Sequence, residues 1–106
     1  MPASKEFLEL VLEKLAPLGA VTGRSMFGGF GVFHEGEMFG LISNDVLYLK
    51  ADDSNREDYV KTGSRQYKPM PYWAVPADVF EDTAELTKWG QKSVNIAHTA
   101  PKKKKQ

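Results

Sequence analysis

The stretch VTGRSMFGGFGVFHEGEMFGLISNDVLYLK, residues 21–50, sets the architecture expected for this chain. Three turn signals interrupt its aromatic and aliphatic residues, at Phe27-Gly28-Gly29, Glu35-Gly36 and Asn44-Asp45. The pattern predicts four short strands, at Val21–Met26, Phe30–His34, Glu37–Ser43 and Val46–Lys50. Connections this short leave no room for a crossover, so neighbouring strands must run antiparallel. The stretch therefore predicts a β-meander.

A helix is expected before the meander, over residues 4–16. Ser4 is a suitable N-cap, and Pro17 with Gly19 ends the helix. Apolar residues recur at helical spacing and form one face, at Phe7, Leu8, Val11, Leu12 and Leu15. Because a lone amphipathic helix of this length is marginal in water, we expect it to pack on the sheet.

Two further helices and an edge strand are expected after the meander. A short helix through Tyr59 ends near Gly63, and a last helix runs from about Thr83 to His98. Between them, residues 65–75 are aromatic but contain two prolines, which predicts an edge strand or two short pieces. The inward residues of the last helix are expected to be Leu86, Trp89, Ser93, Ile96 and Ala97. The fold class is therefore α+β, a two-layer sandwich of helices on an antiparallel sheet.

A chain of 106 residues is expected to form one domain, over residues 1–100, followed by a disordered basic tail at 101–106. It contains no cysteine, which excludes disulfides and a thiolate nucleophile and suits a cytoplasmic location. No run of eighteen apolar residues occurs, so no membrane partner is expected.

The zero net charge conceals an asymmetry. Residues 1–101 carry ten Lys and Arg against fourteen Asp and Glu, and the tail adds Lys102, Lys103, Lys104 and Lys105. An acidic body does not attract phosphate backbones, which argues against nucleic-acid binding by the general surface. The tail itself predicts at most a weak, salt-sensitive contact with nucleic acid.

The glycine-rich segment from Arg24 to Phe33 has three interpretations. A phosphate cradle would need a helix after the glycines, and a strand is expected there instead. Gly29-Phe30-Gly31-Val32-Phe33 partly resembles the RNP1 signature, but Gly28 stands where a basic residue is expected. We therefore expect the glycines to allow tight turns and close approach of strands.

No catalytic residue, metal ligand or cofactor is predicted. His34 and His98 are distant in sequence and lack the spacing of a zinc motif. We interpret His34 and the adjacent Glu35 as a solvated polar pair at a turn. No nucleophile motif such as GxSxG is present.

Five residues form the candidate recognition surface. Arg24 and Lys50 are long charged side chains in or at the end of expected strands, where β-branched residues are commoner. Tyr67, Tyr72 and Trp73 form an aromatic cluster flanked by prolines. Core packing explains the cluster most simply, and an exposed patch for a protein partner is the alternative.

The segment RSMFGGFGVFHEGEMFGLISNDVLYLK, together with Met70-Pro71-Tyr72-Trp73 and the Leu86…Trp89 pair, resembles the N-terminal domain of the TfoX/Sxy competence-regulator family. The resemblance covers roughly residues 7–98. It implies a two-layer fold similar to secretion chaperones and a role in regulating competence genes together with the cyclic-AMP receptor protein. The family implies no catalytic residues and no cofactor.

We therefore expect a stand-alone, non-catalytic regulatory or protein-interaction domain with an unidentified protein partner; a homodimer is also left open. One alternative is a nucleic-acid-associated accessory protein that uses the lysine tail and the sheet face. The other is a small enzyme whose site is too dispersed to read from one sequence.

Overall fold

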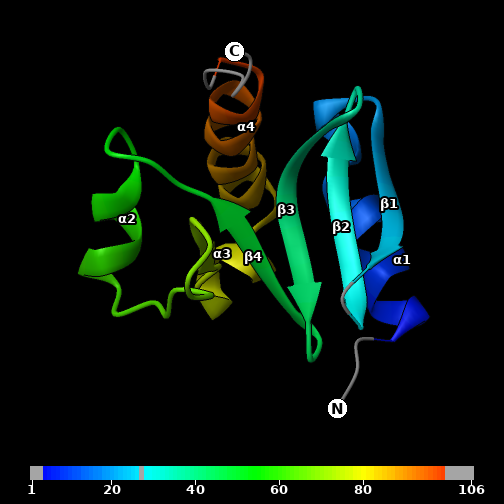
Figure 1. Cartoon of the computed structure of the whole chain (residues 1–106), viewed down its shortest axis with the longest axis horizontal. Coiled ribbons are helices and arrows are strands. Elements are labelled where there is room, and N and C mark those ends of the chain that lie inside the picture. The colour runs from blue at the N-terminus through cyan, green and yellow to red at the C-terminus, as the bar shows by residue number, and fades with distance from the viewer. Residues whose placement is uncertain (1–3, 27, 100–106) are drawn as a thin grey trace.

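A five-stranded antiparallel sheet forms the centre of the structure (Figure 1). The computed structural model describes residues 4–26 and 28–99. The strands follow one another in space in chain order: β1 (Val21–Met26), β2 (Gly29–His34), β3 (Glu37–Ser43), β4 (Val46–Lys50) and β5 (Tyr72–Ala74). The predicted four-strand meander is confirmed, and β5 extends it at the β4 edge.

Two-residue turns join β2 to β3 and β3 to β4. Both residues of each turn have positive φ, 49° and 85° at Glu35 and Gly36, and 51° and 58° at Asn44 and Asp45. Turns of this kind match the right-handed twist of the paired strands. They fix the antiparallel register across the centre of the sheet.

A β-bulge interrupts the pairing of β2 with β3. Val32 pairs with Gly40, but Phe33 pairs with Met38, so Phe39 is an extra residue in β3. Phe39 therefore turns toward the helices instead of continuing the alternation. It joins Ile42 in the main core, whereas ordinary alternation places Leu41 on the opposite face of the sheet.

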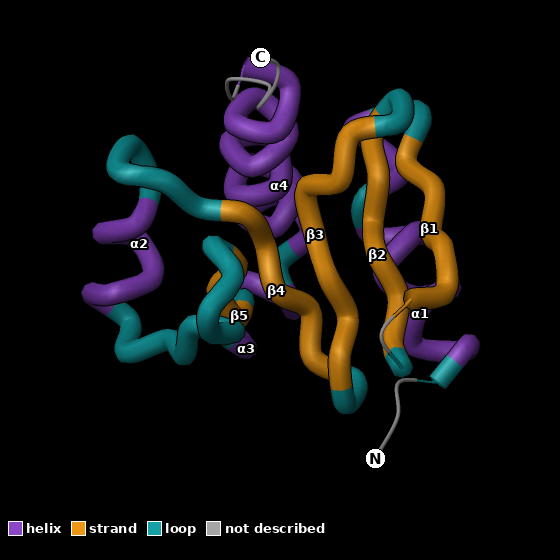
Figure 2. Tube along the Cα trace, viewed as in Figure 1, coloured by secondary structure: helices purple, strands orange, loops and turns teal. Residues whose placement is uncertain are grey.

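Helices cover one face of the sheet (Figures 1 and 2). The helical elements are α1 (Lys5–Lys14), the 3₁₀ turn η1 (Ala16–Leu18), α2 (Arg56–Lys61), α3 (Ala77–Glu81) and α4 (Thr83–Thr99). The helices α1, α3 and α4 lie behind the sheet in these views, and α2 lies beside β4. Ser4 caps α1 as predicted, because its hydroxyl oxygen accepts a hydrogen bond from the Phe7 amide at 3.1 Å.

The main core lies between the sheet and the helices. Its fully buried side chains come from α1, the central strands and α4 and include Val11, Leu15, Val32, Phe39, Ile42, Leu49 and Leu86. The inward face predicted for the last helix is confirmed at Leu86, Ser93, Ile96 and Ala97. Trp89 is half-buried and packs against the same core.

The region between α2 and α4 differs in part from the sequence prediction. Residues 65–75 form two short pieces, β5 and a single bridge between Gln66 and Trp73. The five-residue helix α3 was not predicted, because one turn is too short to show helical periodicity. The basic tail expected at residues 101–106 lies outside the described residues.

Substitution of Gly29 tests the close approach of β2 to β3. A Cβ at this position would overlap the carbonyl oxygen of Ile42, a backbone atom that cannot rotate away. We expect Gly29→Ala to lower the free energy of unfolding by about 3 kcal/mol in urea titrations followed by circular dichroism. The control is Gly36→Asn, where no atom lies within 4 Å and asparagine tolerates the positive φ. Equal stability of the two variants would contradict the described strand packing.

Candidate functional site

The sheet face away from the helices is here called the open face. Among residues 4–26 and 28–99, other segments cover one half of it and leave the other half uncovered. Residues 65–71 fold over its β4–β5 half and form a second, smaller core with Leu41, Tyr48 and Tyr72. The Tyr67 ring meets Tyr48 edge to face at 5.1 Å, and the Tyr67 amide donates to the Tyr72 carbonyl at 2.8 Å. Burial beneath this segment raises the pKa of the Tyr72 phenol. Tyr67 and Tyr72 therefore pack against the sheet.

The uncovered half of the open face carries Arg24. Its guanidinium lies over the Phe33 ring, 4.7 Å from the centroid. Gly31 pairs with Arg24 across the strands, and the Met26 sulfur and Phe33 ring occupy the space that a side chain at Gly31 would need. Met38 pairs with Phe33 on the next strand. We call Arg24, Met26, Phe33 and Met38 the Arg24 patch.

The Arg24 patch combines charge with apolar surface. Arg24 is exposed, whereas Phe33, Met26 and Met38 are half-buried. A guanidinium over an aromatic face gains roughly 0.5–1 kcal/mol at exposed sites, enough to favour one orientation of the side chain. The patch thus presents the Arg24 guanidinium in a defined position among apolar side chains.

Lys50 lies apart from this patch. It pairs with Tyr72 at the far edge of the sheet, and three strand spacings of about 4.8 Å separate β4 from β1. Its carbonyl oxygen accepts hydrogen bonds from the Ser93 hydroxyl at 2.7 Å and from the side-chain amide of Asn55 at 3.4 Å. The backbone of Lys50 thereby joins β4 to α4 and to the loop before α2.

Trp73 faces the opposite side of the sheet from Tyr72, because neighbouring strand residues alternate. It pairs with Leu49 and packs into the main core, with its ring 6.3 Å from that of Tyr59. Tyr72 and Trp73 therefore pack in two different cores, as core packing of the cluster predicts, and do not share one exposed patch. Of the five predicted residues, only Arg24 lies in the uncovered half.

Sequence reasoning missed Phe33 and Met26 as neighbours of Arg24. The signal was available in the strand register: with Arg24 opposite Gly31, residues two positions away on either strand share its face. The sequence predicts the strands, and their register then determines which side chains surround Arg24.

Tyr59 anchors α2 to the core. It is fully buried and meets the Trp89 ring edge to face at 4.9 Å. Burial raises the pKa of its phenol far above the ordinary value. Its hydroxyl makes no hydrogen bond within the described residues. A phenol this hard to ionise is unsuited to acid–base chemistry near neutral pH.

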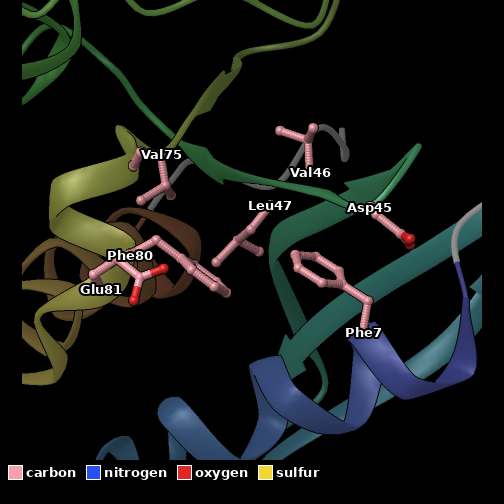
Figure 3. A pocket seen from close by; sticks show the side chains of 8 residues that line it. Phe7, Asp45, Val46, Leu47, Val75, Phe80 and Glu81 are labelled. Atoms are coloured by element: carbon pink, nitrogen blue, oxygen red, sulfur yellow. The ribbon is translucent and has the colours of Figure 1, made fainter.

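A shallow pocket of about 200 Å³ lies among α1, the start of β4 and α3 (Figure 3). Its lining is mainly apolar, with Asp45 and Glu81 as the titratable groups. The Asp45 carboxylate already accepts a hydrogen bond from the Ser4 amide at 2.7 Å. The pocket is smaller than typical small-molecule sites and brings no nucleophile or base together with these acids.

The structure also places His34 beside His98, two residues that no sequence motif connects. Glu35 lies within reach of both rings. No local motif signals this grouping, because it arises where the last turn of α4, a helix that packs on β3 and β4, reaches the end of β2.

Comparison with known proteins bears on this architecture. The family model of the TfoX N-terminal domain matches residues 13–97, most of the chain. The chain belongs to the TfoX N-terminal domain family. The resemblance drawn from the sequence is therefore confirmed.

One curated relative of this TfoX-type domain is the DNA transformation protein TfoX1 of Aliivibrio fischeri (strain ATCC 700601 / ES114). The two are 30% identical over 69 residues, which is 65% of this chain and 33% of the relative. The chain thus spans about a third of the length of the relative that it matches. Within the described residues, no helix has both the length and the apolar character needed to cross a bilayer.

Two hydroxyl deletions should have opposite effects on this domain. We expect Tyr59→Phe to leave stability unchanged or raise it by about 1 kcal/mol, because the buried hydroxyl has no partner. Ser93→Ala should lower stability by about 1–2 kcal/mol, because it removes a buried donor to the Lys50 carbonyl. Urea unfolding at neutral pH measures both. A large loss of stability in Tyr59→Phe would mean that the phenol hydroxyl has a bonding role.

Proposed function

We propose that this chain is a non-catalytic regulatory domain that binds a protein partner through the Arg24 patch. The observation that carries the proposal is the Arg24 guanidinium held over the half-buried Phe33 ring on the uncovered half of the sheet. Arginine, methionine and aromatic residues are enriched in protein interfaces, and arginine is among the residues that contribute most to binding energy.

Two observations favour a protein partner over nucleic acid. The body of the chain carries fourteen acidic against ten basic residues, a balance that repels phosphates. Phe30 and Val32, which occupy aromatic positions of the RNP1-like segment, both pack in the main core. Within the part of the chain that the structure describes, these two positions therefore offer no exposed ring of the kind that RNA-recognition motifs stack on bases.

Membership of the TfoX N-terminal domain family supports a regulatory role over an enzymatic one. The pocket, with Asp45 already hydrogen-bonded and no adjacent base, offers no acid–base pair. The relative named a DNA transformation protein supports a role connected with competence. We therefore propose that the partner belongs to the machinery that controls DNA transformation.

Site-specific photo-crosslinking in the native host tests this proposal. A photoreactive amino acid at exposed Thr22, which pairs with Phe33, should capture one defined protein. Arg24→Ala and Phe33→Leu should abolish the adduct. Each should also raise the dissociation constant of the purified pair by at least about 10-fold. The matched control is Arg56→Ala, an exposed arginine on α2 paired with Asp53.

Three outcomes would contradict the proposal. Equal adduct yield from wild type, Arg24→Ala and Arg56→Ala would remove the Arg24 patch from the interface. A crosslink to nucleic acid instead of protein would favour the accessory role. An adduct formed only with a second copy of the chain would reassign the patch to a homodimer.

A further inference from the structure

Three potential metal ligands meet where β2 ends and α4 ends. His34 is the last residue of β2, Glu35 begins the turn after it, and His98 lies in the last turn of α4. The Nδ1 atom of His34 lies 2.9 Å from the Nε2 atom of His98. One ligand atom from each of the three residues lies within 4.8 Å of the others.

Regular structure positions these side chains. The backbone amide of Glu35 donates to the Ala20 carbonyl at 3.3 Å, which holds the turn against the start of β1. His98 follows Val94 and Ala97, which are buried in the main core. The two imidazoles meet edge to face, with centroids 5.1 Å apart. Ligands placed on a strand end and a helix keep a fixed separation.

One hydrogen bond between the two rings does not satisfy all the polar atoms that meet at this point. The Nε2 atom of His98 lies 2.9 Å from the His34 ring nitrogen and 3.0 Å from the His34 carbonyl oxygen. If Nε2 carries a proton, both neighbours must share that single hydrogen. If Nε2 accepts from His34, its lone pair faces the carbonyl oxygen. In either tautomer two ring nitrogens and a carbonyl oxygen, all able to donate an electron pair, share a single proton, and a bound cation would take the place of that proton.

We propose that His34, Glu35 and His98 bind a divalent transition-metal ion, with Zn²⁺ as the best match. Two imidazoles and a glutamate form a recognised three-ligand zinc set that leaves a fourth position for water. Two nitrogens about 2.0 Å from a tetrahedral zinc lie about 3.3 Å apart, so the rings need separate by only roughly 0.4 Å.

The metal site is independent of the proposed protein-binding role. His34 shares the helix side of the sheet with Val32, and His98 lies on α4, whereas the Arg24 patch lies on the open face. A bound ion would link the last turn of α4 to the β2–β3 turn. The expected consequence is a metal-dependent rise in thermal stability, since an ion that binds only the folded state stabilises it.

Calorimetric titration of the untagged full chain with Zn²⁺ alone tests the site. At about pH 7.5 few protons compete with Zn²⁺ for an ordinary imidazole nitrogen, so one ion should bind per chain. His34→Ala and His98→Ala should each weaken binding by about 100-fold, and Glu35→Gln by about 10-fold. Glu57→Gln, an exposed glutamate on α2, is the matched control and should bind as wild type does.

Thermal melts with chelator and with Zn²⁺ separate metal binding from folding. Wild type and Glu57→Gln should melt higher with Zn²⁺, whereas His98→Gln should show no metal-dependent shift. Glutamine keeps a polar group that can reach the His34 carbonyl, so this variant should match wild type in chelator. The proposal would be overturned by absence of binding, by affinity unchanged in His98→Gln, or by several weak sites insensitive to these substitutions.

Discussion

The bulge at Phe39 is the constraint that places the largest side chain of β3 in the main core beneath the helices. Without the extra residue, Phe39 and Leu41 would share one face of β3. With it, Phe39 joins Ile42 beneath the helices, while Leu41 joins the smaller core on the other side. A one-residue change of register would move every side chain in that end of the strand to the opposite face of the sheet. The central strand therefore serves two cores at once.

Two cores on one sheet leave a particular surface uncovered. Residues 65–71 occupy the open face over β4 and β5, and the helices occupy the other face along its length. The part of the open face that these described segments leave exposed is formed by β1, β2 and the start of β3. Gly31 has no side chain there, so Met26 and Phe33 occupy the space beside it. The location of the Arg24 patch thus follows from what the rest of the chain covers.

The meander and the first helix were predictable because their signals are local. Turn residues at Glu35-Gly36 and Asn44-Asp45 and the Ser4 cap act within a few positions of where they stand. The bulge was not predictable, since apolar alternation does not say which residue is skipped. The candidate site was less predictable, because the register of the three-residue strand β5 depends on its partner and places Tyr72 and Trp73 on opposite faces of the sheet. The meeting of His34 and His98 depends wholly on tertiary packing.

The hydrogen bond from Ser93 to the Lys50 carbonyl spans 43 residues, and it has a consequence for synthesis of the protein. The side chains of α4 form much of the cover over β3 and β4. While the chain is still emerging from the ribosome, the meander exists without that cover, and its apolar face stays open to water. The domain is therefore expected to complete its folding only after α4 is released, and chaperones that shield nascent chains would act in that interval.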